Sequence, residues 1–104
     1  MMNEALRTPP TLQSLRKRRA EILALAERHG VSDVRVVGSV ARDEAQPGSD
    51  VDLLVSVKPG VTMFDLVGLW QDLQALLGCE VNLLTDGIPD EPFMRRVRRD
   101  AVRL

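Results

Sequence analysis

The feature that most limits how this 104-residue chain can fold is a regular alternation of helical and strand-like segments. Helices are expected over residues 12–29, 40–44, 63–77 and 93–104. Between them lie three short apolar runs typical of strands, at residues 33–37, 50–57 and 80–85. This order, αβαβαβα, predicts an α/β fold in which helices pack against one sheet.

Capping signals mark the ends of the two long helices. Thr11 is a candidate N-cap for the first helix. Thr62, followed three residues later by Asp65, resembles a capping box, and Gly78 supplies a stop for that helix. The apolar stripe of the second long helix is expected to pack in the core; it consists of Met63, Leu66, Val67, Trp70, Leu73, Leu76 and Leu77.

Length and composition predict a single domain over residues 1–104, with residues 1–10 as a flexible lead-in. Cys79 is the only cysteine, so no internal disulfide can form. A net charge of −1 and only three aromatic residues argue against direct nucleic-acid binding. We find no apolar run long enough to span a membrane and no signal-peptide core, so the expected location is cytoplasmic.

Two carboxylates stand at the start of the most apolar strand. Asp50 and Asp52 are two residues apart and therefore point to the same face of that strand. Burying two like charges is costly unless a cation neutralises them, and oxygen ligands suit Mg²⁺ or Mn²⁺. A bare Asp-x-Asp more often means that both carboxylates are solvated at an exposed strand end. The surrounding residues must decide between metal binding and solvation.

A Gly-Ser pair ends the preceding strand and opens the short helix. Gly38 lets the backbone come close to a ligand, because glycine has no Cβ. Ser39 then begins a helical turn whose free amide groups can face a phosphate. Taken alone, such a pair is ordinary turn chemistry.

Together these residues form a longer pattern, Gly-Ser-Val-Ala-Arg at residues 38–42 and Ser-Asp-Val-Asp-Leu at residues 49–53. The pattern resembles the signature of the DNA polymerase β-like nucleotidyltransferase superfamily, and in detail the minimal nucleotidyltransferases of prokaryotes. The resemblance extends through the order of elements over residues 12–104. It implies the minimal nucleotidyltransferase fold, a three-stranded mixed sheet flanked by four helices.

The resemblance also implies a role for each matching residue. Asp50 and Asp52 would be catalytic and would carry two Mg²⁺ (or Mn²⁺) ions, which bridge the phosphates of ATP and activate the acceptor hydroxyl. Arg42 is equally compatible with a structural role. The candidate nucleotide-binding residues are Gly38, Ser39, Arg42 and Ser49.

The chain departs from the family pattern at two positions. Relatives supply a third carboxylate from a later strand, where this chain has Asn82. An amide oxygen can bind a hard cation, but it has no charge and is a poor base, so weaker metal binding and slower transfer are expected. Asp43 follows the arginine where relatives often have glycine. The sequence leaves open whether Asn82 is a third metal ligand or the mark of an inactive enzyme.

The resemblance further implies that the acceptor lies on another protein. In the MntA-like antitoxins of HEPN/MNT toxin–antitoxin systems, AMP passes from ATP to a tyrosine hydroxyl of a HEPN-domain toxin encoded nearby. Two alternatives stay open: an antitoxin that acts by binding alone, and a subunit of a small-molecule nucleotidyltransferase that completes its acceptor pocket as a homo-oligomer or with a partner. The last helix carries a basic face that is either solvated or a docking surface, made of Arg95, Arg96, Arg98 and Arg99.

Overall fold

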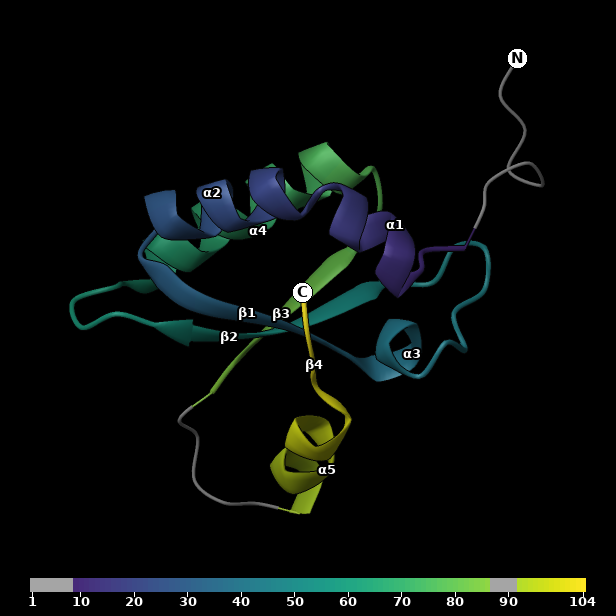
Figure 1. Cartoon of the computed structure of the whole chain (residues 1–104). Helices are drawn as coiled ribbons and strands as arrows, with labels where there is room; N and C mark the ends of the chain where they lie inside the picture. Colours follow the sequence, from purple (N-terminus) through teal and green to yellow (C-terminus); the bar gives the residue numbers. More distant parts are fainter. Residues whose placement is uncertain (1–8, 87–91) are drawn as a thin grey trace.

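One mixed sheet organises the molecule, as the computed structural model shows for residues 9–86 and 92–104 (Figure 1). Its strands are β1 (Val31–Val37), β2 (Val51–Val57), β3 (Val81–Thr85) and β4 (Val102–Arg103). They lie in the order β3-β2-β1-β4, so β3 and β4 are the edges. β1 pairs antiparallel with β2 and β4, whereas β2 pairs parallel with β3. The expected lead-in, residues 1–10, falls mostly outside the described residues.

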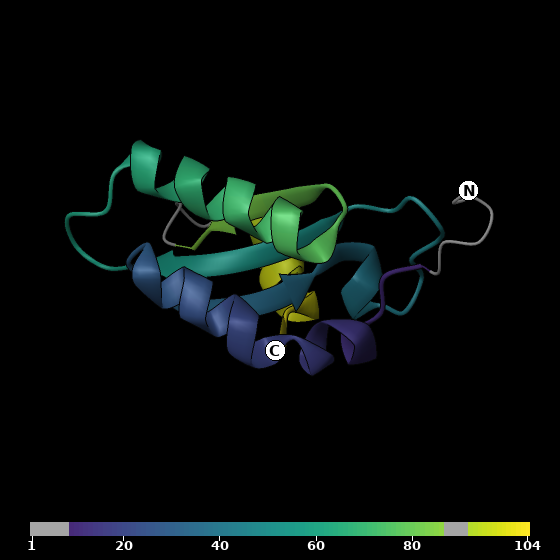
Figure 2. The same cartoon turned by 90° about the horizontal axis from the view of Figure 1, so that it is seen from above.

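Helices cover both faces of this sheet, but unequally. They are α1 (Leu12–Lys17), α2 (Arg19–Arg28), α3 (Gly38–Ala41), α4 (Met63–Leu77) and α5 (Pro92–Asp100). α1, α2 and α4 lie over one face and α5 lies under the other, as Figures 1 and 2 show. The predicted α/β fold is confirmed, although the described residues contain four strands and five helices rather than three and four. None of these described helices is long and apolar enough to cross a bilayer.

The capping signals act as the sequence predicts. Thr11 Oγ1 accepts a hydrogen bond from Ser14 N at 3.0 Å and begins α1. At the start of α4, Thr62 N donates to Asp65 Oδ2 at 2.8 Å, which completes a capping box. Gly78 ends α4 in the left-handed conformation with φ 69°, a conformation that glycine adopts without a Cβ clash.

The single helix expected over residues 12–29 is wrong in one respect, because it is interrupted at Arg18. The backbone there has φ −108° and ψ 19°, outside the helical region. The Arg18 Nη1 donates to Leu76 O at the end of α4, at 2.9 Å. Lys17 and Arg19 beside it are good helix formers, so local propensity carries no signal of the interruption.

The last helix is shorter than expected from the apolar spacing up to Leu104. It ends at Asp100, and β4 then pairs with Arg35 and Val36 of β1. Leu104 is consequently buried in the core beneath α2 and α4 instead of continuing the helix on the α5 face. A two-residue strand has no periodicity of its own, so only the open edge of β1 specifies it.

β2 divides the interior into two apolar clusters because its side chains alternate between the two faces. Leu53 and Val55 belong to a large cluster packed beneath α2 and α4. Leu54 belongs to a small cluster together with Met94 of α5. Asp52, two residues before Leu54, therefore lies on the thinly covered face.

The apolar stripe of α4 was expected to be core, and this is only partly correct. Leu73 is buried, but Met63, Val67 and Trp70 are 72%, 42% and 37% exposed. α4 packs against β3, which is the edge of the sheet. On the side of α4 that faces beyond this edge, the described part of the chain consequently supplies no further strand to cover it.

Candidate active site

The strand register brings three separate segments of the sequence to one place. Asp52 is the partner of Val37 across the antiparallel β1–β2 ladder and of Asn82 across the parallel β2–β3 ladder. Gly38 directly follows Val37, so the glycine turn and Asn82 lie on either side of Asp52. Strand pairing therefore brings the expected site residues together, although Val37 and Asn82 are about 45 positions apart in the sequence.

The amide of Asn82 stands between the two carboxylates. Its Nδ2 donates to Asp52 Oδ1 at 2.9 Å and to Asp50 Oδ2 at 3.3 Å. Asp50 and Asn82 are exposed and Asp52 is half-buried. The amide thus offers positive hydrogen atoms to both carboxylates, where a bound cation would otherwise offset their charge.

These three side chains provide oxygen donors that suit a hard divalent cation. Asp50 and Asp52 supply the negative charge, and Asn82 can supply a neutral oxygen only if its amide turns over. Among the described residues there is no group of three or more His, Cys, Asp or Glu side chains that could hold a metal ion. A metal bound here would accordingly be held by two charged side chains rather than three.

Gly38 is required both for its backbone conformation and for the space beside it. Its φ is +73°, a value that L side chains rarely adopt. A Cβ at this position would overlap the carboxylate of Asp52, whose Cγ would lie 3.2 Å away. Ser39 follows in the first turn of α3, and Val37 before it gives this turn no side-chain cap. The turn keeps its backbone next to the carboxylates.

Arg42, at the C-terminal end of α3, is already held by carboxylates. Its Nε donates to Glu44 Oε1 at 2.9 Å, and its Nη1 lies 3.5 Å from Asp100 Oδ2. The hydrogen bond to Glu44 raises the pKa of the guanidinium above its ordinary value. The adjacent Asp43 has φ 58°, so this is a left-handed position, which accounts for the preference for glycine implied by the resemblance.

Ser49 lies in the turn before β2. Its Oγ accepts a hydrogen bond from Gln46 N at 2.8 Å, and its own N–H donates to Gln46 O at 2.9 Å. The hydroxyl therefore closes the turn that delivers Asp50 to the site. Direct nucleotide binding by Ser49 stays a prediction.

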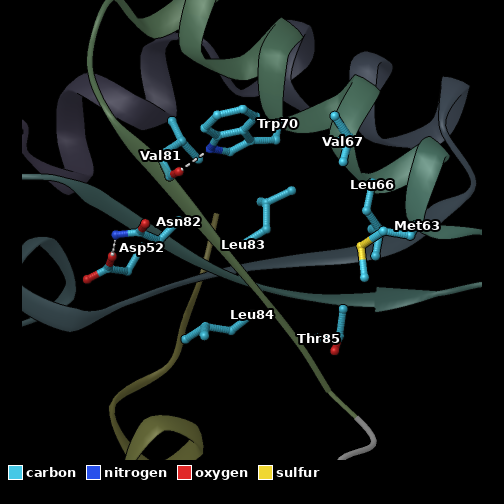
Figure 3. A pocket seen from close by; sticks show the side chains of 10 residues that line it. All are labelled: Asp52, Met63, Leu66, Val67, Trp70, Val81, Asn82, Leu83, Leu84 and Thr85. Carbon is cyan, nitrogen blue, oxygen red and sulfur yellow. Dashed lines mark hydrogen bonds between the residues drawn. The ribbon is translucent and has the colours of Figure 1, made fainter.

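Asp52 lies between two hollows of different character. The larger is a groove of about 670 Å³ that runs along β3 and α4, with Asp52 and Asn82 at one end and Trp70 among its walls (Figure 3). The smaller is a cavity of about 290 Å³ between α3, α5 and the sheet, and it includes Gly38. Both volumes are near or within the range of roughly 300–1,000 Å³ typical of ligand pockets.

Comparison with known proteins agrees with this geometry. Residues 19–103 match the nucleotidyltransferase domain family. The chain belongs to this family. It is 36% identical over 78 residues to the protein adenylyltransferase MntA of Thermococcus cleftensis, covering 75% of this chain and 79% of that protein. The membership of the nucleotidyltransferases that the sequence predicted is thereby confirmed.

Two solved structures share the fold of this nucleotidyltransferase. One, described as a minimal nucleotidyltransferase, is 43% identical with a TM-score of 0.78, covering 91% of this chain and 97% of that chain. The other is an MNT antitoxin in complex with a tri-AMPylated HEPN toxin of Shewanella oneidensis. It covers 85% of this chain and 69% of that chain with a TM-score of 0.63, and at 16% identity it shows likeness of fold alone.

The groove beside the carboxylates is not predicted by the sequence. Met63, Val67 and Trp70 were expected in the core, whereas all three line this groove. No local signal marked this groove, because the exposure of this part of α4 follows from the position of β3 at the edge of the sheet. The Trp70 Nε1 donates to Val81 O at 2.6 Å, which fixes the indole against that edge.

Proposed function

We propose that this nucleotidyltransferase transfers AMP from Mg-ATP to a tyrosine hydroxyl of a HEPN-domain toxin and so acts as its antitoxin. The observation that carries the proposal is the convergence of Asp50, Asp52 and Gly38 in a relative of a protein adenylyltransferase. The MNT antitoxin that shares this fold is seen with an AMPylated HEPN toxin, which supports the choice of partner.

In this reaction the acceptor oxygen attacks the α-phosphorus of ATP. The bond from that phosphorus to the bridging oxygen breaks, pyrophosphate leaves with the electron pair, and the hydroxyl proton passes to a base. Asn82 has no basic atom, so within this group only Asp50 or Asp52 can accept the proton. A divalent metal held by these carboxylates would supply positive charge for the phosphates and the leaving pyrophosphate.

The groove along β3 supports an acceptor with an aromatic side chain. It ends at Asp52, and most of its other lining residues are apolar, with Trp70 and Leu83 among them. An apolar groove with polar groups at one end suits tyrosine, whose ring is apolar and whose hydroxyl is polar. The same walls would exclude water from the ring while the hydroxyl faces the carboxylates.

A second function, inhibition of the partner by binding alone, is favoured by one specific observation. Asn82 Nδ2 already donates hydrogen bonds to both carboxylates, which stabilises the site without a metal. Metal binding must break these bonds, and the third carboxylate expected by resemblance is missing. Transfer would then be slow or absent while the contact surface stays intact.

The deciding experiment mixes the purified protein with a HEPN-domain protein encoded beside it and with Mg-ATP, and follows the partner by intact mass spectrometry. We expect a slow AMP mass increment with the natural chain, faster modification with Asn82→Asp, and none with Asp52→Ala. If the natural chain and Asn82→Asp both leave the partner unmodified yet neutralise its toxicity, binding alone is the function. No association with that partner would refute both functions.

A further inference from the structure

The smaller cavity has one wall that comes from α5. Arg96 and Asp100 are four residues apart on this helix, so they lie on the same face, and both line the cavity. Gly38 and Asp52 line it from the opposite side. The arginines of α5 therefore do not form one uniform surface, because Arg96 lines the same cavity as Gly38.

The arginines near this cavity differ in how they are neutralised. Arg42 is shared between Glu44 and Asp100, and Arg98 Nε donates to Asp86 Oδ1 at 3.0 Å. Arg96 is exposed and has no ion-pair partner among the residues that the structure describes. Its guanidinium thus lines the same cavity as Gly38 without forming an ion pair with any described carboxylate.

We propose that Arg96 is a phosphate-binding residue that holds the triphosphate of the nucleotide in this cavity, opposite the Gly38 turn. The assignment rests on the proposed nucleotidyl transfer and adds a residue from α5 to its site. A guanidinium offers several N–H donors in a planar fork that matches phosphate oxygens. A cavity of about 290 Å³ lies at the lower limit for ligand pockets, so it suits a phosphate chain better than a whole nucleotide.

The test compares three variants of α5 by isothermal titration calorimetry with a non-hydrolysable ATP analogue and Mg²⁺. Arg96→Ala should raise the Kd at least about tenfold, since it removes charged hydrogen bonds. The Kd of Arg96→Lys should lie between those of the natural chain and Arg96→Ala, because lysine keeps the charge and lacks the planar fork of N–H donors. Arg99→Ala, which removes an exposed arginine of the same helix that does not line the cavity, should leave the Kd within about twofold.

Inorganic tripolyphosphate with Mg²⁺ separates phosphate binding from base recognition. The natural chain should bind it, and Arg96→Ala should weaken it by a factor similar to that for the ATP analogue. An Arg96→Ala change that weakens the analogue but leaves tripolyphosphate unchanged overturns the assignment, as does equal binding by Arg96→Ala and Arg99→Ala. If the natural chain binds neither ligand, the proposed nucleotidyl transfer itself fails.

Discussion

The two faces of the sheet divide stability and chemistry between them. Beneath α2 and α4 lies a continuous cluster that includes fully buried Leu53 and Leu69. Beneath α5 the buried cluster is small, and Figures 1 and 2 show α5 crossing that face. Asp52 and its strand partner Asn82 lie on this sparsely covered face, and Asp52 lines the cavity between α5 and the sheet.

This difference shows how one short chain can hold a fold and an open site in the same sheet. Strand alternation sends every second residue of β2 to the packed face, and these residues can be uniformly apolar. The other face of β2 can carry a carboxylate as well as apolar residues, because α5 covers only part of it. Leu54 is buried there, whereas Asp52 is half-buried. Substitutions on the two faces should therefore change different properties, which can be measured separately.

The largest expected effect tests this division with the same substitution on each face. Leu69→Ala should lower the free energy of unfolding by about 3 kcal/mol, because it leaves a cavity in the packed cluster. Leu84→Ala, at a half-buried residue that lines both hollows, should lower it by only about 1 kcal/mol. Urea denaturation measures both free energies of unfolding, and equal losses would show that the two faces contribute equally to stability.

A smaller effect is expected where the backbone approaches the carboxylate. Gly38→Ala should cost about 2 kcal/mol of stability, since it combines a positive φ with a clash against Asp52. It should also abolish binding of Mn²⁺, detected by electron paramagnetic resonance.

Gly60→Ala is the matched control for that substitution. Gly60 has φ +90° but no atom within 4 Å of an added Cβ. Its replacement should cost about 1 kcal/mol through backbone strain alone and leave Mn²⁺ binding unchanged. Similar behaviour of the two variants would mean that the contact with Asp52 has no consequence.

The smallest expected effect concerns the amide between the carboxylates. Without metal, Asn82→Asp should lower the free energy of unfolding by about 1 kcal/mol, because two hydrogen bonds are replaced by repulsion at an exposed site. With Mn²⁺ the variant should gain more in melting temperature than the natural chain does, since a third carboxylate binds the ion more tightly.

Asn82→Ala serves as the reference, because it removes the amide without adding charge. It should lose the hydrogen bonds, and Mn²⁺ should raise its melting temperature less than that of Asn82→Asp, because it supplies no third carboxylate. An Asn82→Asp variant that is as stable as the natural chain without metal and binds Mn²⁺ no more tightly would show that this side chain does not take part in the site.

The sequence was sufficient for features that are encoded within a few residues. The capping box at Thr62, the left-handed stop at Gly78 and the three main strands follow from local spacing and composition. It did not predict the interruption of the first helix at Arg18 or the strand β4 after Asp100. The helix interruption accompanies a contact with Leu76, and β4 depends on the edge of β1, so neither has a local cause.

The sequence by itself determined the alternation of elements, the Gly-Ser turn, the paired carboxylates and, through them, membership of the nucleotidyltransferase family. The tertiary structure alone decided that Asn82 bonds to Asp50 and Asp52, that part of α4 is exposed beside β3, and that Arg96 faces the Gly38 turn. The physical reason is range. Helix period, caps and turns arise from neighbours along the chain, whereas register, sheet edges and cavities arise from residues that only pairing and packing bring together.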